Sequence, residues 1–493
     1  MFSYFLKKVA EQVDLNFIDT DRRNIGINPK KYRVFCLTKR KDDVIMDDET
    51  GYTRKNIAGV VMDIIERKQY LDRLIAKKDN GMVKVITGIR RVGKSFLLFE
   101  LYHKYLNSIG VPDAQIIELS LDDDENAMYR NPLKLGEYIR GKLTNADKRY
   151  YIFLDEIQKV KSVKNPYLEE EDRIGFVDVV LGLMRKPNAD VYVTGSNSRM
   201  LSSDILTEFR GRGDEIRVYP LSFREFYAAY DKDKRYAWGE YYVYGGMPFL
   251  LRLNDHASKS QYLKELFENI YLKDILERHH IVDKNVLDDL LDVISSSVGS
   301  LTNPKRIADT FKSVKGVKIA DDTISRFLDY FENAFMISKV RRYDVKGRKY
   351  IGSPMKYYFT DIGLRNARLN FRQTEENHIM ENIIYNELLI RGYSVDVGIV
   401  EYNYTDREGR NRKTRLEVDF VANAGSRRYY IQSALTVGEE EKREQEVRPF
   451  ARIPDSFKKI VVVKDNIIPW HDERGILYVG IERFLLEENA MEL

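Results

Sequence analysis

A glycine-flanked loop between an apolar strand and an amphipathic helix constrains this chain more than any other feature. Residues 83–87 favour a strand, and apolar residues recur at helical spacing from Phe96 to Leu106. The eight residues between them, Gly88 to Ser95, fit Gly-x-x-x-x-Gly-Lys-Ser at every defined position. The glycines allow backbone N–H groups to face an anion, and the helix directs its positive end to the same place. The sequence therefore predicts a phosphate-binding loop.

The chemistry of the loop indicates ATP with Mg²⁺ as its ligands. The Lys94 ammonium is expected to reach the β- and γ-phosphates, while the Ser95 hydroxyl ligates Mg²⁺. Arg90 and Arg91 either sense phosphate or pair with an acid, and the sequence leaves both roles open. The expected nucleotide-binding residues are Gly88, Arg90, Arg91, Val92, Gly93, Lys94, Ser95 and Phe96.

Two acids end another apolar run, Tyr151-Ile152-Phe153-Leu154-Asp155-Glu156. Asp155 is expected to lie beside Ser95 and hold Mg²⁺. Glu156 is then expected to polarise the water that attacks the γ-phosphate. The alternative is an ordinary strand that runs into an acidic turn, but the loop upstream favours the catalytic interpretation.

Further candidates follow the fourth strand. Either Asn197 or Ser196 is expected to contact the γ-phosphate or the attacking water, the alternative being a turn of small residues. Arg210 and Arg212 are flanked by glycines, and one of them is a candidate arginine finger, acting in cis or from a neighbouring subunit. A solvated basic loop is the competing interpretation.

Four segments in order, GIRRVGKS, FLDEIQKV, VTGSNSRML and FRGRGDEIRVYPLSFREF, resemble the AAA+-related archaeal-type ATPases of bacteria and archaea. MPFLL, YYFTDIGLRNA, MENIIYNELLIRGY and LEVDFV resemble the carboxy-terminal domain of unknown function that follows the ATPase in that family. The resemblance covers about residues 62 to 493. It also implies an arginine in the lid, for which Arg252 is the nearest candidate without a clear motif.

Alternating short apolar strands and helices independently predict a parallel sheet with helices on both faces. Together with the resemblance, this gives a multidomain α/β protein. The expected parts are an amino-terminal extension over 1–60, a P-loop ATPase domain of AAA+ type over 61–220, a helical lid over 221–299, a winged-helix domain over 300–370, and a restriction-endonuclease-like α/β domain over 371–493.

A basic hairpin is expected to form the wing. Residues 301–350 contain 12 Lys+Arg against 6 Asp+Glu, and two helices precede the hairpin. This geometry can place a helix in a major groove and cations on phosphates, although winged helices also serve as protein–protein modules. The candidate nucleic-acid contacts are Arg341, Arg342, Lys346, Arg348 and Lys349, with Thr323, Ser325 and Arg326 on the second helix.

The restriction-endonuclease resemblance implies a Mg²⁺ site built from an acid on a helix, an Asp, and an acid with a Lys on one strand. The sequence offers Glu381 or Glu387 on the helix, and Asp419 next. Gln432 stands where the second acid belongs and Ala434 where the lysine belongs. We therefore expect this domain to be catalytically degenerate, with Glu417 as a substitute ligand in the competing interpretation.

Composition excludes several classes. A net charge of +4 argues against bulk attraction to nucleic acid or membrane, and the single cysteine, Cys36, excludes an internal disulfide framework. With neither a long apolar run nor a signal peptide, a cytoplasmic protein without membrane contact is expected. We expect ATP hydrolysis that acts as a conformational switch. The alternatives are a DNA-associated factor whose affinity is gated by ATP and, less favoured, a Mg²⁺-dependent nuclease. A protein client and the oligomeric state stay open.

Overall fold

The computed structural model describes residues 44–45, 53–57, 60–168, 171–195, 209, 211–279, 281, 284–372, 375–405 and 409–493. The chain divides into two compact units, Met1–Ile64 and Ile65–Leu493. In the first unit three strands pair antiparallel in the order β1 (Val44–Ile45), β2 (Thr53–Ile57) and β3 (Val60–Ile64). Most of the expected extension over residues 1–60, including Cys36, lies outside the described residues.

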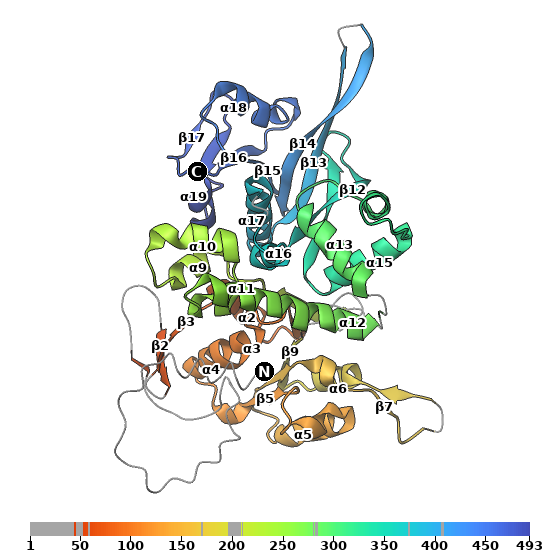
Figure 1. The fold of residues 1–493 in the computed structure, drawn as a ribbon. Helices are drawn as coiled ribbons and strands as arrows, with labels where there is room; N and C mark the ends of the chain where they lie inside the picture. The colour runs from red at the N-terminus through yellow and green to blue at the C-terminus, as the bar shows by residue number, and fades with distance from the viewer. Residues whose placement is uncertain are drawn as a thin grey trace, which may run out of the picture. The chain divides into compact units, whose positions relative to one another are not determined.

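Five parallel strands form the first sheet of the second unit, in the order β10-β4-β9-β6-β5 (Figure 1). This confirms the predicted parallel α/β architecture. Because parallel strands end at the same edge of a sheet, the segments that follow β4, β9 and β6 meet there. The strand bounds are β4 Val83–Thr87, β5 Ile116–Ser120, β6 Tyr150–Asp155, β9 Ala189–Thr194 and β10 Gly213–Arg217.

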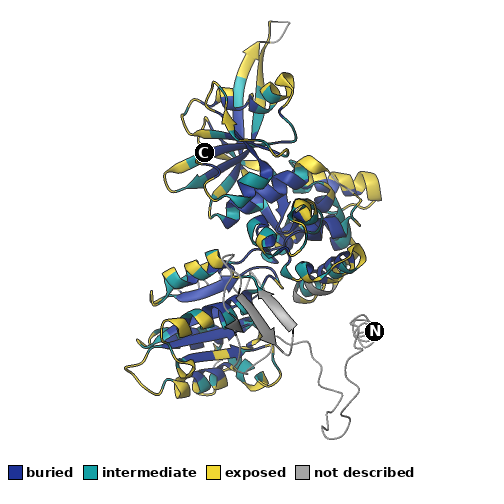
Figure 2. Cartoon of the chain, turned by 90° about the vertical axis from the view of Figure 1, so that its left-hand side faces the viewer, coloured by how far each residue is buried: buried dark blue, intermediate teal, exposed yellow. Residues whose placement is uncertain are grey.

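Helices cover both faces of this sheet, whose strands are mostly buried (Figure 2). On one face, Leu135 of α5 and Val180 of α6 share a core cluster with strand residues. On the other face, the Tyr102 ring lies 5.8 Å from that of Phe153 and 5.0 Å from that of Tyr192. The covering elements are α2 (Lys68–Lys77), the consecutive segments α3 (Lys94–Phe96), η1 (Leu97–Tyr102) and α4 (His103–Ser108), α5 (Pro132–Lys142) and α6 (Phe176–Met184).

Two boundaries differ from the sequence prediction. Helix α2 was expected from Ile64 but begins at Lys68, because Ile64 ends strand β3 and Arg67 is left-handed with φ 47°. A left-handed L-residue interrupts helical hydrogen bonding, so the helix starts only after it. Strand β10 ends at Arg217, two residues before the predicted end. Short elements complete this part: η2 Asp113–Gln115, η3 Ala127–Arg130, η4 Ile157–Lys159, β7 Val163–Lys164 and β8 Arg173–Ile174.

A helical segment follows the sheet, as expected for a lid. Ser222 begins it with a capping box, in which its side chain accepts from the Glu225 N–H and Glu225 caps the Ser222 N–H in return. The predicted break at Gly245 is present, where the backbone has φ 77°. The bounds are α9 Phe223–Ala229, η5 Lys234–Tyr236, α10 Ala237–Tyr244, η6 Pro248–Arg252, α11 His256–Glu265, η7 Leu266–Leu272, α12 Lys273–His279 and α13 Lys284–Ser296.

The carboxy-terminal part contains an eight-stranded mixed sheet in the order β12-β11-β13-β14-β15-β16-β18-β17. Strand β11 pairs antiparallel with β12 and parallel with β13, so the hairpin expected as a wing forms one edge of this sheet. The strands are β11 Ile337–Asp344, β12 Lys349–Phe359, β13 Ser394–Thr405, β14 Asn411–Ala424, β15 Arg427–Ala434, β16 Lys458–Val463, β17 Trp470–His471 and β18 Leu477–Gly480.

Helices accompany this sheet. The pair α14 and α15, which contact each other, corresponds to the two helices expected before the wing. The helix α17 packs against β12, β13, β14 and β15. The bounds are α14 Pro304–Thr310, η8 Phe311–Lys315, α15 Asp321–Asn333, α16 Ile362–Arg368, α17 Glu376–Ile390, α18 Glu440–Val447, η9 Phe450–Arg452 and α19 Ile481–Leu486.

A histidine bridge joins α4 to strand β5. His103 Nδ1 lies 2.6 Å from Glu118 Oε1, and its Nε2 lies 3.1 Å from Asp113 Oδ1. The hydrogen bond to Glu118 and the charges of Glu118 and Asp113 outweigh burial and raise the pKa of His103 to about 9. Protonation of His103 therefore stabilises the folded state.

The His103→Gln variant is expected to unfold at a lower temperature than the wild type at pH 6. The unfolded pKa is about 6.5, so the stabilisation is fully present below that pH and is lost as the pH rises through about 9. For a partly exposed group we expect roughly 1 kcal/mol. Melting temperatures of both proteins at pH 6 and pH 9.5 measure this, with His471→Gln as a control on an exposed histidine. A difference that does not change with pH contradicts the bridge.

Candidate nucleotide-binding site

The loop Gly88–Ser95 lies between β4 and α3 and holds its lysine inside. Lys94 is buried, and its Nζ donates to the carbonyls of Gly88 at 2.9 Å and Ile89 at 3.1 Å. Burial lowers the pKa of Lys94 to about 8, although the charges of Glu156 and Asp155 oppose this. The carbonyls carry no formal charge, so the ammonium keeps its positive charge for an anionic ligand.

The glycines of the loop are required for different reasons. Gly88 has φ 135°, and a Cβ there would lie 2.2 Å from the Val218 carbonyl oxygen. Gly93 has φ 91°, and a Cβ there would meet no atom within 4 Å. Gly88 is therefore needed for the close approach to the segment after β10, whereas Gly93 is needed only for its backbone conformation.

Two acids lie at the carboxyl end of β6, beside the end of β9. Asp155 is the last residue of β6, and the Thr194 hydroxyl at the end of β9 donates to its Oδ1. Burial raises the pKa of Asp155, while hydrogen bonds from the side chains of Thr194 and Ser95 lower it. The backbone N–H of Glu156 donates to Thr194 Oγ1 at 3.3 Å. The strand order thus brings Ser95, Thr194 and both acids to one edge of the sheet.

Glu156 is a carboxylate held in an unfavourable environment. Its backbone is left-handed with φ 53°, and its side chain accepts a hydrogen bond from Gln158. Burial raises the pKa of Glu156, the nearby charge of Asp155 raises it further, and Lys94 lowers it. A carboxyl group whose pKa is raised toward neutral pH is a stronger base, which suits general-base chemistry.

The arginines of the loop have different surroundings. Arg90 forms an ion pair with Asp274 of α12 at 3.1 Å, and its carbonyl accepts from the Tyr271 hydroxyl at 2.9 Å. Of the two roles left open for Arg90, pairing with an acid is present. Arg91 is exposed and left-handed, with φ 65°.

Three of the predicted residues lie outside the described part of the chain: Ser196, Asn197 and Arg210. Arg212 is described and exposed, immediately before β10. Because Gly213 pairs with Val83 and Arg217 with Thr87, Arg212 is at the opposite end of the sheet from the loop. Five residues of strand separate them, about 15 Å. Arg212 is therefore not brought to the loop of its own chain.

Sequence reasoning missed the role of Arg67. Its guanidinium is buried and donates to the carbonyls of Val92 at 2.9 Å and Tyr219 at 2.6 Å. Its Nε lies 3.0 Å from Glu225. One side chain thus joins the loop, the segment after β10 and the first lid helix. Arg67 stands alone in a short segment before α2, so no spacing or motif pointed to it.

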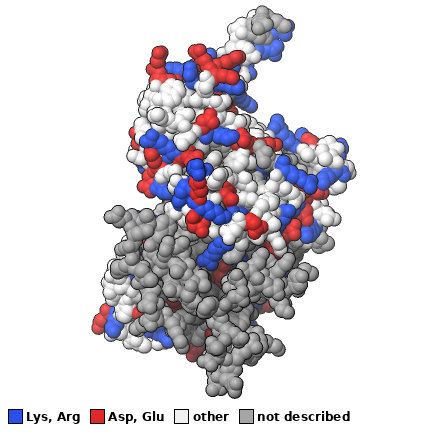
Figure 3. All heavy atoms as spheres, turned by 60° about the vertical axis from the view of Figure 1, so that its left-hand side comes forward, with Lys and Arg blue, Asp and Glu red and all other residues white. Residues whose placement is uncertain are grey.

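Arg342, predicted as a nucleic-acid contact, is buried and donates to the Ser353 carbonyl. That prediction is wrong for Arg342, because on this strand alternate side chains point into the protein. The other four predicted cations of the hairpin are exposed: Arg341, Lys346, Arg348 and Lys349. Acidic and basic side chains are interspersed over the face in Figure 3, without one dominant sign. No described helix is long and apolar enough to cross a membrane.

The carboxy-terminal sheet contains a second cluster of charged side chains. Of the two helix acids left open by the sequence, Glu381 lies at the cluster with Asp419, 3.0 and 4.0 Å from the Nζ of one lysine, whereas Glu387 pairs with Arg391 at 2.6 Å. Ala434 is buried, but a lysine reaches the cluster from another strand: Lys356 of β12. Sequence reasoning considered only the position of Ala434 and did not find this lysine. In the sequence, the only sign that Lys356 is buried was its position directly before the apolar run Tyr357-Tyr358-Phe359.

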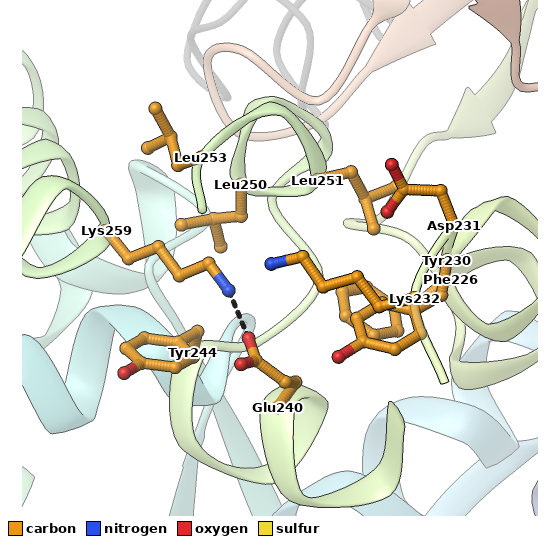
Figure 4. Close-up of a pocket in the computed structure, with 10 residues that line it drawn as sticks. All are labelled: Phe226, Tyr230, Asp231, Lys232, Glu240, Tyr244, Leu250, Leu251, Leu253 and Lys259. Carbon is orange, nitrogen blue, oxygen red and sulfur yellow. Dashed lines mark hydrogen bonds and ion pairs between the residues drawn. The ribbon is translucent and has the colours of Figure 1, made fainter. Parts of the chain in front are cut away.

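A small cavity lies within the lid (Figure 4). Lys259 and Glu240 form an ion pair across it, and its volume of about 10 Å³ accommodates about one water molecule. This cavity is too small for a nucleotide. It is lined by Phe226, Tyr230, Asp231, Lys232, Glu240, Tyr244, Leu250, Leu251, Leu253 and Lys259.

Gly88→Ala is expected to destabilise the protein more than Gly81→Ala. Both positions have positive φ, but a Cβ at Gly81 would meet nothing within 4 Å, whereas one at Gly88 would collide with the Val218 carbonyl. The added cost is about 1–3 kcal/mol, and nucleotide binding should be lost only in Gly88→Ala. Melting temperature and binding of a fluorescent ATP analogue measure both effects. If the two variants have the same melting temperature and the same nucleotide binding, the close approach of Gly88 to the Val218 carbonyl is contradicted.

Family models match two parts of the chain. Residues 80–227 match the family described as "AAA domain", and residues 235–375 match "Domain of unknown function (DUF8612)". The first match contains the loop, Asp155, Glu156 and Thr194. It identifies this part as a P-loop domain of the AAA type, as the sequence predicted.

Among solved structures, Cdc6p from Pyrobaculum aerophilum covers 70% of this chain and 99% of its own, with 12% identity and a TM-score of 0.27. The Aeropyrum pernix ORC1 protein in complex with DNA covers 62% of this chain and 92% of its own, with 12% identity and a TM-score of 0.24. Similarity at this level supports no inference about function.

Two relatives match most of the chain. An uncharacterised protein of Methanocaldococcus jannaschii is 26% identical over 444 residues, 87% of this chain and 90% of the relative. An uncharacterised protein of Haemophilus influenzae is 33% identical over 404 residues, 81% of this chain and 93% of the relative. In this chain an AAA domain is followed by a domain of unknown function. The chain therefore belongs to the same family as the Haemophilus influenzae protein.

Proposed function

We propose that the protein binds ATP in the loop Gly88–Ser95 and hydrolyses it with Mg²⁺, and that hydrolysis acts as a conformational switch. The observation that carries the proposal is the meeting of Lys94, Asp155, Glu156 and Thr194 at one edge of the sheet. This set supplies a desolvated cation, a hydroxyl-bound acid and a second acid with a raised pKa. A cation for the phosphates, an acid for Mg²⁺ and an acid that positions the attacking water are the groups that phosphoryl transfer to water commonly uses.

The side chains present fit a hydrated nucleotide–metal complex. A hydroxyl and a carboxylate are oxygen ligands that Mg²⁺ accepts, and the Ser95 side chain lies close enough to Asp155 to lower the pKa of that carboxyl. Mg²⁺ held by these two residues would neutralise phosphate charge. Lys94 would bind the β- and γ-phosphates, and Glu156 would take the proton of the attacking water.

Two further residues belong to the proposal. Asn197 would contact the γ-phosphate or the attacking water, as its position after β9 suggests. Arg212 would act from a neighbouring copy of the chain, because it lies at the far end of the sheet within its own chain. An arginine supplied in this way stabilises charge that develops on the transferred phosphate.

Contacts that lead away from the loop support the switch. The loop contacts the lid through the Arg90–Asp274 pair, which should respond to phosphate charge beside Arg90. The lid in turn contacts α16, where Asp361 accepts from the Gly246 N–H at 2.7 Å and Asn366 donates to the Val243 carbonyl at 2.9 Å. A change at the loop would thus reach the carboxy-terminal sheet through packed elements.

Lys94→Ala is expected to weaken ATP binding at least a hundredfold, because it removes the cation that faces the phosphates. Glu156→Gln is expected to retain binding and to lower turnover by about 10²–10⁴-fold, the usual effect of losing a general base. Titration calorimetry with a non-hydrolysable ATP analogue and a phosphate-release assay measure the two effects.

Matched controls are Lys104→Ala and Glu137→Gln, which change exposed residues of the same domain. Both controls should behave as the wild type. Retained turnover in Glu156→Gln would remove this residue from the mechanism, and unchanged analogue binding in Lys94→Ala would overturn the whole proposal.

Nucleic acid is a second candidate partner, through the tip of the β11–β12 hairpin. Its support is the set of four exposed cations within nine residues, Arg341, Lys346, Arg348 and Lys349. The helix α15 opposes this role, since it has Asp321 and Asp322 in its first turn and would repel phosphates. Any contact would therefore involve the hairpin rather than the helix.

Replacement of Lys346, Arg348 and Lys349 by Gln is expected to reduce the salt dependence of duplex DNA binding. Each lost phosphate contact lowers the slope of log affinity against log salt by about 0.9. Fluorescence anisotropy across a salt series measures the slope. The control is a triple Gln variant of lysines that are exposed in another part of the chain, far in sequence from the hairpin: Lys104, Lys134 and Lys142. If both triple variants give the same slope, the hairpin is ruled out as a contact for DNA.

A further inference from the structure

A buried lysine lies among the carboxylates of the carboxy-terminal sheet. Lys356 Nζ lies 2.8 Å from Glu417 Oε1, 3.0 Å from Glu381 Oε2 and 4.0 Å from Asp419 Oδ1. Lys356 is on β12, Glu381 on α17, and the other two acids on β14. One ammonium therefore contacts acids from two other elements, which are far apart in the sequence.

The two buried acids of the cluster, Glu381 and Asp419, also accept hydrogen bonds from other parts of the protein. Glu381 Oε2 also accepts from the Tyr358 hydroxyl at 3.0 Å, and Asp419 Oδ2 accepts from the Ser433 N–H at 2.8 Å. The amide of Gln432 lies between the Asp419 N–H and Glu446, with both contacts at 3.4 Å. Glu381 and Asp419 thus each accept at least one hydrogen bond from another part of the protein.

The centre of this cluster is occupied by an ammonium nitrogen. Mg²⁺ requires several oxygen ligands in octahedral geometry at about 2.0–2.1 Å, whereas the carboxylates here lie around the Lys356 nitrogen, the two nearest at 2.8 and 3.0 Å. Among the described residues, no group of three or more His, Cys, Asp or Glu side chains is placed to hold a metal ion. The residues present therefore do not fit the metal that a restriction-endonuclease resemblance implies.

A cation is already present at the centre of the cluster. The buried Lys356 ammonium lies within 4.0 Å of carboxylate oxygens of Glu381, Glu417 and Asp419. It therefore offsets part of their negative charge at the place where a metal ion would otherwise do so.

We infer that Lys356 takes the place of the divalent cation in this cluster, so that the carboxy-terminal sheet binds no Mg²⁺ and cleaves no nucleic acid. Through its ion pairs, the ammonium of Lys356 on β12 links this strand to α17 and β14, and we call this set of contacts the joint. Removal of Lys356 leaves Glu381 and Glu417 without the cation that they share, and these carboxylates then accept a divalent ion. This inference does not depend on the nucleotide site, which lies in a different sheet.

The test compares Mn²⁺ binding by the full chain without nucleotide, measured by electron paramagnetic resonance. The wild type and Asp419→Asn are expected to bind Mn²⁺ equally, because the cluster contributes no site. Lys356→Met is expected to bind one Mn²⁺ at least tenfold more tightly than the wild type, and Asp419→Asn in that background should abolish the gain. The inference is overturned if the wild type binds a Mn²⁺ ion that Asp419→Asn removes. It is also overturned if a folded Lys356→Met protein binds Mn²⁺ no more tightly than the wild type.

If Lys356→Met does not fold, a charge-balanced variant decides the question. Lys356→Met with Glu381→Gln removes one charge of each sign, and it should recover most of the lost melting temperature if the two residues form the joint. Failure of this double variant to recover stability overturns the inference. Incubation of the wild type and Asp419→Asn with DNA and Mn²⁺ gives an independent readout, since cleavage specific to the wild type is incompatible with a lysine-filled site.

Discussion

The buried guanidinium of Arg67 is the interaction on which the geometry of the nucleotide site depends. It joins Val92 of the loop to Tyr219 after β10 and to Glu225 of α9. Hydrogen bonds to a charged group contribute about 1.5–3 kcal/mol each, and loss of one partner would leave the other buried and unpaired. The curl of the loop is therefore fixed by a residue that precedes it by more than 20 positions. The same side chain fixes where the lid begins.

The connection from the lid to the carboxy-terminal sheet depends on close backbone approach. A Cβ on Gly246 would lie 2.2 Å from the Leu221 carbonyl oxygen, and one on Gly363 would lie 1.8 Å from that of Tyr244. Burial raises the pKa of Asp361 to about 6, although N–H donors from Gly246, Leu364 and Gly363 lower it. Side chains would separate these segments, so the glycines allow the lid and α16 to act as one packed body.

The two lysine–carboxylate clusters show how geometry decides between a ligand site and a structural joint. In the loop, Lys94 donates to the neutral carbonyls of Gly88 and Ile89, so its charge remains available to an incoming anion. In the carboxy-terminal sheet, Lys356 contacts Glu381 and Glu417 directly, so its charge is already engaged by acids of the protein. The residue types are similar, but only the first arrangement needs a partner from outside the protein.

The sequence by itself determined the loop Gly88–Ser95, the acids Asp155 and Glu156 and the parallel sheet that presents them, because these features depend on local spacing and on apolar runs. Only the tertiary structure decided the roles of Arg67, Thr194 and Lys356, since each acts on residues distant in the chain. It also decided that Arg342 is buried and that Arg212 lies far from its own loop. Local patterns specify which strands and helices form, whereas the contacts between them depend on strand order and packing, which no single segment encodes.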